Sequence, residues 1–129
     1  MIILKAIVEK IYEQAKKEAP IEACGYGAGN NNEINEIYPM TNVDKSSEHF
    51  SFDPKEQFAA VKEARSKGLQ LIAVYHSHPA SPARLSQEDI KLAYDPNIIW
   101  IIASLYEKET IKAFKIVNNE IIEEELTIK

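Results

Sequence analysis

The stretch LIAVYHSHPASPARLSQEDI, residues 71–90, joins an apolar segment to a proline-containing turn and then to a polar segment. The apolar part is rich in β-branched residues, which is typical of a buried strand, and Pro79 ends that strand. The segment 86–94 is expected to begin a helix. Two histidines stand at the end of the strand, and an aspartate stands in the first turn of the helix. The stretch therefore combines a strand-to-helix connection with side chains that can bind a metal ion.

Helical and strand patterns continue on both sides of this stretch. Apolar residues at helical spacing predict a helix from about residue 4 to 15, and Pro20 marks its end. The other expected elements are two strands at 23–29 and 33–40 joined by an Asn-rich turn, a short strand at 49–52, a helix at 54–68, a strand at 97–106, and a hairpin over 111–129 that turns at Asn118-Asn119. The expected fold class is α/β, a mixed and mostly antiparallel sheet flanked by helices.

Length, composition and charge narrow the class of protein. The chain has 129 residues, of which 45% are hydrophobic and 27% charged, so one domain over residues 1–129 is expected. The net charge of -5, from 15 basic and 20 acidic residues, provides no basic field for a nucleic acid. The apolar runs are too short to cross a membrane, and the N-terminus lacks a signal-peptide pattern, so a cytoplasmic location is expected. The single cysteine, Cys24, excludes an internal disulfide and a cysteine-based zinc cluster.

The two histidines of the opening stretch have the spacing of metal ligands on a strand. Side chains two residues apart point to the same face, so His76 and His78 project together and Ser77 points away. A loop that returns the following helix to the strand end would bring Asp89 close as a third ligand. Two histidines and one carboxylate, with one position left for water, form a catalytic zinc pattern. The alternative is structural, since Ser86 and Asp89 also match a helix-capping pattern.

Zinc-dependent hydrolysis also requires a base that is not a tight metal ligand, so that a proton can move from water to the departing amine. The candidate carboxylates, among which spacing does not choose, are Glu22, Asp44, Glu48, Asp53 and Glu88. Glu22 differs from the others because it lies between the helix-ending Pro20 and an apolar strand.

The string His76-Ser77-His78-Pro79, followed by Ser86 and Asp89, resembles the JAMM motif of the MPN-domain metalloproteases. The upstream segment PIEACGYGAG resembles the segment that carries the catalytic glutamate in that family. The segment NVDKSSEHFSFDP and the helix after it are similar to those of compact prokaryotic members. The resemblance therefore covers nearly the whole chain.

This resemblance implies a fold and a set of residue roles. The fold would be the MPN fold, which is similar to that of cytidine deaminases. His76, His78 and Asp89 would bind one zinc ion, Glu22 would be the general acid and base, and Ser86 would hydrogen-bond the tetrahedral intermediate.

The implied activity is cleavage of a peptide or isopeptide bond next to the C-terminus of a ubiquitin-like protein. The chain is too short for the insertions that grip ubiquitin in eukaryotic members. Small ubiquitin-like sulfur carriers ending in Gly-Gly are therefore the expected substrates, with their tail added to a sheet edge. Neither the carrier, the leaving group nor the oligomeric state follows from the sequence.

Two other functions remain open as alternatives, a non-catalytic MPN scaffold and a DNA-repair-associated JAMM-like protein. The segment 25–30, GYGAGN, is not a dinucleotide-binding loop, because its last glycine is missing and no helix pattern follows. His49 is interpreted as a surface or satisfied core histidine rather than a residue of a cleft. Cys24, Trp100 and Tyr106 are interpreted as core residues.

Overall fold

The computed structural model of the chain describes residues 1–83, 97–106 and 108–129. The predicted helix at 86–94 lies outside these residues. Within them the chain forms, in order, β1 (Ile2–Ile3), α1 (Lys5–Glu18), β2 (Cys24–Asn30), β3 (Glu33–Met40), α2 (Pro54–Ser66), β4 (Gln70–His78), β5 (Ile99–Ser104), β6 (Thr110–Val117), β7 (Glu120–Glu124) and β8 (Thr127–Ile128).

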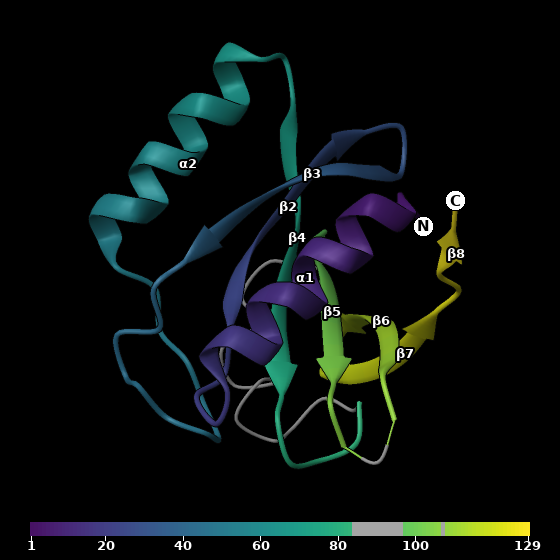
Figure 1. Cartoon of the computed structure of the whole chain (residues 1–129). Coiled ribbons are helices and arrows are strands. Elements are labelled where there is room, and N and C mark those ends of the chain that lie inside the picture. Colours follow the sequence, from purple (N-terminus) through teal and green to yellow (C-terminus); the bar gives the residue numbers. More distant parts are fainter. Residues whose placement is uncertain (84–96, 107) are drawn as a thin grey trace.

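The strands of the described residues join in one sheet with the order β7-β6-β5-β4-β2-β3-β1-β8 (Figure 1). Four of the seven pairings are antiparallel, whereas β4 with β5, β1 with β3 and β1 with β8 are parallel. β4 therefore lies in the middle of the sheet, with β2 on one side and β5 on the other. The predicted fold class, a mixed and mostly antiparallel sheet with helices packed on it, is confirmed.

The sheet is curled. β7 and β8 stand at opposite ends of the strand order, yet only residues 125 and 126 separate them in the chain. The three steps from Glu124 to Thr127 span at most about 11 Å, so the two edges of the sheet come close together. The amino group of Met1 donates to the carbonyl oxygen of Glu125 at 3.2 Å, and the Thr127 amide donates to Met1 O at 2.9 Å. These contacts hold the N-terminal and C-terminal strands side by side.

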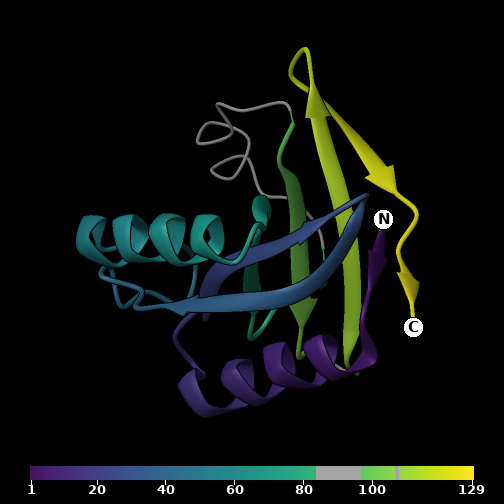
Figure 2. The ribbon, with the colours of Figure 1, turned by 90° about the horizontal axis from the view of Figure 1, so that it is seen from above.

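The two faces of the sheet carry two apolar clusters, because successive side chains of a strand point to opposite faces. α1 covers one face, where Ile7 and Ile11 pack in a cluster with Tyr75 and Ile101. The other cluster includes Trp100, Ile102, Phe50 and, from α2, Ala60. Figure 2 shows β3 passing between α1 and α2. The even-numbered side chains at the end of β4 therefore point away from α1.

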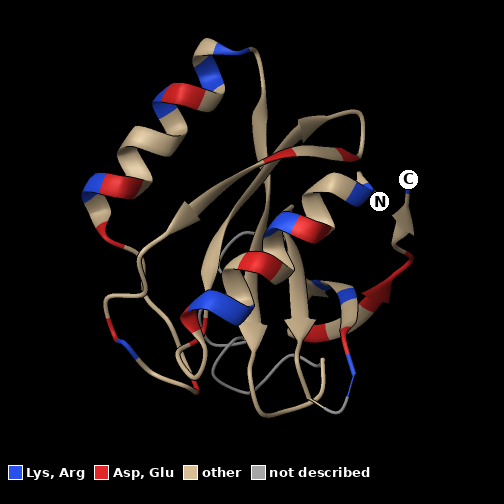
Figure 3. Cartoon of the chain, in the orientation of Figure 1, with Lys and Arg blue, Asp and Glu red and all other residues tan. Residues whose placement is uncertain are grey.

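Both predicted helices in the described residues are confirmed. α1 buries residues at helical spacing, namely Ile7, Val8, Ile11, Tyr12 and Ala15. α2 begins at Pro54, and the side chain of Asp53 caps it by accepting a hydrogen bond from Lys55 N at 2.9 Å. Basic and acidic residues are interspersed along both helices (Figure 3). None of the helices in the described ranges is long and apolar enough to cross a membrane.

The predicted turns are confirmed, but one predicted strand is wrong. The β2–β3 turn at Asn31-Asn32 and the β6–β7 turn at Asn118-Asn119 have positive φ angles of 54° and 62°, and of 51° and 64°. Asparagine tolerates this conformation, which two-residue hairpins require. Residues 49–52 do not form a strand, because a single isolated bridge joins Phe52 to Asn42. Polar contacts of the loop replace a ladder there.

Candidate metal and acid–base site

The end of β4 brings the two histidines together on one face of the sheet. His76 and His78 are buried, with exposed fractions of 0% and 5%. Their Nε2 atoms lie 3.1 Å apart. The even spacing along the strand therefore places both rings on the face opposite α1, as the sequence predicts.

The turn after β4 fixes the orientation of His78. Its Nδ1 lies 2.9 Å from the carbonyl oxygen of Pro82. A carbonyl oxygen only accepts, so Nδ1 carries the hydrogen and donates it, and the lone pair of a neutral ring is on Nε2. The turn itself is tied to the next strand, because Ser104 Oγ donates to Ser81 O at 2.5 Å. Such an outer contact is the one that usually orients a metal-binding imidazole.

Aromatic side chains surround His76. The Phe50 ring lies 4.9 Å from the His76 ring at an angle of 31°, and the Trp100 ring lies 6.2 Å away at 82°. Phe50 comes from the loop between β3 and α2, whereas Trp100 comes from β5. These contacts limit the rotation of the ring and exclude water from its sides.

The pairing of β2 with β4 places Glu22 next to the histidines. Cys24 pairs with His76, and one residue further the Ser77 amide donates to Ala23 O at 2.9 Å. Continuing this antiparallel register by one more residue sets Glu22 opposite His78, and directly opposed side chains share a face. Glu22 has an exposed fraction of 3%.

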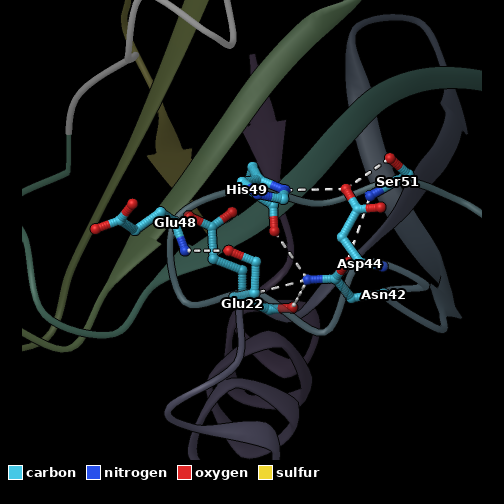
Figure 4. A network of polar contacts seen from close by, with 7 residues as sticks. Glu22, Asn42, Asp44, Glu48, His49 and Ser51 are labelled. Carbon is cyan, nitrogen blue, oxygen red and sulfur yellow. Dashed lines mark hydrogen bonds and ion pairs between the residues drawn. The ribbon is translucent and has the colours of Figure 1, made fainter.

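Hydrogen bonds from two neighbouring segments fix the backbone around Glu22. Its amide donates to Ser46 O at 2.8 Å, and its carbonyl oxygen accepts from Asn42 Nδ2 at 3.1 Å. The amide of Ala23 donates to Ser77 Oγ at 2.8 Å. In Figure 4, dashed lines join the side-chain amide of Asn42 to both Glu22 and His49. Ser77 thus points away from the histidine face, as the sequence predicts, and ties the Glu22 segment to β4.

The histidine pair fits a tetrahedral metal ion. Two nitrogens bound to one zinc ion at about 2.0–2.1 Å lie about 3.3 Å apart, close to the observed 3.1 Å. Within residues 1–83, 97–106 and 108–129, no group of three His, Cys, Asp or Glu side chains is close enough to hold a metal. The predicted third ligand, Asp89, and the predicted hydrogen-bond donor, Ser86, lie outside the described residues. The described part therefore provides two imidazole nitrogens at a spacing compatible with one metal ion.

The other candidate bases are placed differently from Glu22. Asp53 caps α2 with its side chain, and Glu48 is exposed. Asp44 accepts hydrogen bonds from Ser51 Oγ at 2.7 Å and from His49 Nδ1 at 3.0 Å, which lower the pKa of its carboxyl group. Glu22 is the one buried carboxylate among the described residues. Glu88 lies outside them.

Burial controls the ionisation of two groups beside the site. Burial, and then the charges of Glu18 and Glu22, raise the pKa of the Cys24 thiol to about 12. Burial, and then the nearby Cys24, also raise the pKa of Tyr75, whose hydroxyl donates to Gln14 Oε1 at 2.5 Å. Cys24 is therefore a neutral core residue at neutral pH, as the sequence predicts.

Trp100 and Tyr106 are both interpreted as core residues from the sequence, and the structure confirms this for Trp100 alone. Trp100 is buried, which confirms its role in packing, whereas Tyr106 is 45% exposed and is not a core residue. Tyr106 lies two residues beyond the end of β5, so the alternation of the strand no longer holds it inside. His49 is a surface histidine held by Asp44, although its neighbour Phe50 contacts His76.

Sequence reasoning missed the polar residues that arrange the site from outside. Asn42 bonds to backbone groups of five other residues, Ser77 Oγ accepts from Ala23 N, and Ser104 holds the turn after β4. The alternation of the strand indicates the direction of Ser77 but not its partner. Sequence patterns do not indicate the contact of Asn42 with Glu22 O, because these two residues are 20 positions apart in the chain.

The sheet is curled and mixed, and its central strand β4 ends with a buried pair of histidines beside the buried Glu22. These features define the class of protein that the JAMM-like motif predicts. The model of the family described as prokaryotic homologs of the JAB domain matches residues 4–117. The chain belongs to this family. The resemblance to compact prokaryotic JAMM/MPN proteins is thereby confirmed.

Two proteins with functional names are similar to this chain over most of its length. The CysO-cysteine peptidase of Mycobacterium tuberculosis is 26% identical over 132 residues, covering 99% of this chain and 90% of the relative. The desampylase of Pyrococcus furiosus is 28% identical over 123 residues, covering 88% of this chain and 84% of the relative. The alignments therefore span most of each protein.

Solved structures share the fold. A solution structure of a protein from Desulfitobacterium hafniense has a TM-score of 0.90 and 41% identity, covering 100% of this chain and 93% of that one. A JAB1/MPN domain protein from Archaeoglobus fulgidus and a structure described as a JAMM metalloprotease-like zinc site have TM-scores of 0.70 and 0.66. Both are 22% identical, and each comparison covers 100% of this chain and 97% of the other. At that identity the likeness concerns the fold, which is the MPN fold.

Proposed function

We propose that this chain is a zinc-dependent peptidase that cleaves the bond after the C-terminal Gly-Gly of a ubiquitin-like or sulfur-carrier protein. The observation that carries this proposal is the buried pair of imidazole Nε2 atoms, 3.1 Å apart, at the end of a strand whose neighbour holds a buried glutamate. His76, His78 and Asp89 would hold one zinc ion per chain. The cytoplasmic location expected from the sequence is part of the same proposal.

The chemistry divides between the metal and the side chains. A zinc ion held by the two imidazoles would lower the pKa of a water molecule and polarise the substrate carbonyl. Glu22 accepts a proton from the attacking water and later donates it to the departing amine. Its burial supports this role, because a carboxylate removed from bulk water exchanges protons with the substrate more readily than with solvent.

Ser86 has a separate role in the proposal. Its hydroxyl would donate a hydrogen bond to the oxygen that becomes negatively charged during attack. His78 keeps its Nε2 lone pair directed at the site because Pro82 O holds the hydrogen on Nδ1. No residue forms a covalent bond to the substrate in this reaction, and the neutral thiol of Cys24 takes no part.

The names of the relatives support the substrate class. One acts on a conjugate of CysO with cysteine, and the other is a desampylase. Conjugates between the C-terminal tail of a small carrier and an amine are therefore the proposed substrates. One name specifies cysteine as the leaving group and the other specifies none, so the proposal concerns the carrier tail as the recognised part.

Incubation of the purified protein with carrier proteins fused through Gly-Gly to a reporter tests this function. We expect mass spectrometry to find a carrier ending in Gly-Gly, formed by a reaction that a chelator stops and added zinc restores. Cleavage that a chelator does not affect would refute the zinc mechanism. Absence of cleavage by zinc-loaded protein with every carrier would favour a non-catalytic MPN scaffold instead.

A further inference from the structure

We propose that Asn42 is a positioning residue that holds Glu22 against the histidines. Asn42 lies two residues beyond β3, outside the His76-to-Asp89 motif, and takes no part in the proposed chemistry. This inference rests on the proposed function, because it assigns to Asn42 an effect on the proton transfer of Glu22. It also makes a structural claim that can be tested without activity.

The amide of Asn42 connects the strand ends to the loop beside the site. Nδ2 donates to Glu22 O at 3.1 Å and to His49 O at 3.0 Å, with a weaker contact to Ser46 O at 3.4 Å. Oδ1 accepts from Asp44 N at 3.0 Å and from Ser51 N at 3.4 Å. Asn42 is 3% exposed, so water does not replace these partners. Both N–H donors and the carbonyl acceptor of this buried side-chain amide therefore form hydrogen bonds with backbone atoms.

The strand registers explain why this bond controls the position of Glu22. Cys24 pairs with Met40 on one side and with His76 on the other. Two residues further along, both antiparallel registers set Glu22 between Asn42 and His78. Glu22 lies outside β2, so no continuous ladder holds its carbonyl group. The side chain of Asn42 provides the hydrogen bond in place of a strand.

The two peptide groups at Glu22 and Ala23 have all four polar atoms bonded. Glu22 N bonds to Ser46 O, Glu22 O bonds to Asn42, and the amide and carbonyl of Ala23 bond to Ser77. Ser77 belongs to β4 and lies between the two histidines. The backbone amide and the hydroxyl of Ser77 therefore fix this segment from the β4 side, and Asn42 fixes it from the β3 side.

Loss of the hydrogen bonds of Asn42 would slow the proton transfer by Glu22. A displacement of about 1 Å between reacting groups can lower a rate by about 100-fold. Without the Asn42 donor, the Glu22 carbonyl group and the loop at 43–51 lose their shared partner, so the carboxylate occupies a wider range of positions. The two proposed histidine ligands lie on β4 and keep their own contacts, which include the bond between His78 and Pro82. The loss is therefore expected in proton transfer rather than in metal binding.

Two substitutions of Asn42 separate these effects. Asn42→Ser shortens the side chain, leaves one donor and leaves room for water. Asn42→Asp keeps the shape but replaces the donor by an acceptor that faces carbonyl oxygens, so we expect it to have the larger effect. Asn30→Ala is a matched control, because it removes an amide that donates to Gly68 O at 3.0 Å at the far end of β2. Ile34→Val is a control for a loosened core.

The test measures zinc content, and kcat and KM for the carrier proteins fused through Gly-Gly to a reporter. Each variant is measured in the wild-type and Glu22→Gln backgrounds. For Asn42→Ser we expect kcat to fall by about 10-fold or more, with KM and zinc content within about twofold of wild type. In the Glu22→Gln background the same substitution should change kcat by less than about twofold, because the residue through which it acts is absent. The two controls should leave kcat unchanged.

An unchanged kcat in Asn42→Ser, an equal loss in both backgrounds, or a loss proportional to lost zinc would overturn the positioning role. Hydrogen exchange of the Glu22 and Ala23 amides provides the readout that does not need activity. Faster exchange at these amides in Asn42→Ser, but not in Asn30→Ala, is expected. If the wild-type protein cleaves no carrier, the proposed function fails, and the exchange result alone decides whether Asn42 holds Glu22.

Discussion

Replacing Ser77 by alanine tests the connection between the two segments of the site. Ser77 is 1% exposed, and its hydroxyl oxygen accepts a hydrogen bond from Ala23 N at 2.8 Å. The substitution removes one oxygen atom and leaves the backbone bond between Ser77 N and Ala23 O in place. The change is therefore small in volume and specific to one hydrogen bond.

The expected loss follows from the burial of the Ala23 amide. A buried donor that loses its acceptor costs about 1–3 kcal/mol, and we expect about 2 kcal/mol here. With a urea m value of about 2 kcal/mol/M, the unfolding midpoint should fall by about 1 M. For a chain of this length the melting temperature should fall by about 7 °C.

Urea unfolding followed by circular dichroism measures this loss. Ser66→Ala is the matched control, because Ser66 is exposed and its hydroxyl donates to Glu63 O within α2. We expect the control to change the free energy of unfolding by less than about 0.5 kcal/mol. If the Ser77→Ala protein is no less stable than the control protein, the Ser77 hydroxyl does not hold the Glu22 segment.

Three further predictions concern residues around the site. Gly25→Ala should destabilise the protein by about 1–3 kcal/mol in thermal unfolding, because the added methyl group would overlap the buried Tyr75 ring. Native Cys24 should not react with iodoacetamide at pH 8, whereas the urea-unfolded thiol should, because burial raises the pKa of the native thiol to about 12. The hydrogen bond from Ser51 lowers the pKa of Asp44, so the stability of wild type over Asp44→Asn should be present above about pH 4 and disappear as the pH falls through the native pKa.

The sequence predicted the elements with strong periodic patterns or clear turn residues. The spacing of Ile7 and Ile11 predicted α1, and Asn118-Asn119 predicted the β6–β7 turn. The apolar run before Pro79 predicted the central strand. These features are local, so a single sequence contains them.

The curl of the sheet and the loop before α2 could not be predicted in this way. The curl depends on β8 joining β1, which are at opposite ends of the chain. The aromatic pattern at 49–52 resembles a strand, but Phe50 turns toward His76 and the loop bonds to Asn42 instead. Tertiary contacts decide the conformation there, and strand propensity does not include them.

For the site, the sequence predicted that His76 and His78 share one face of the strand, but it did not predict the contacts that support them. Alternation along the strand was sufficient to place His76 and His78 on one face. The position of Glu22 beside them depends on the register between β2 and β4, which the sequence does not specify. The roles of His76, His78 and Glu22 remain proposals, and so do those of Asp89 and Ser86, which lie outside the described part of the chain.

A comparison of wild type with Glu22→Gln, for both zinc content and cleavage of a Gly-Gly-linked carrier fusion, tests the proposed proton transfer by Glu22. We expect equal zinc content and a fall in kcat of about 100-fold to 10,000-fold, because the amide keeps the shape of the side chain but cannot transfer the proton. A Glu22→Gln protein that retains zinc and cleaves at the wild-type rate would show that Glu22 is not the general acid and base.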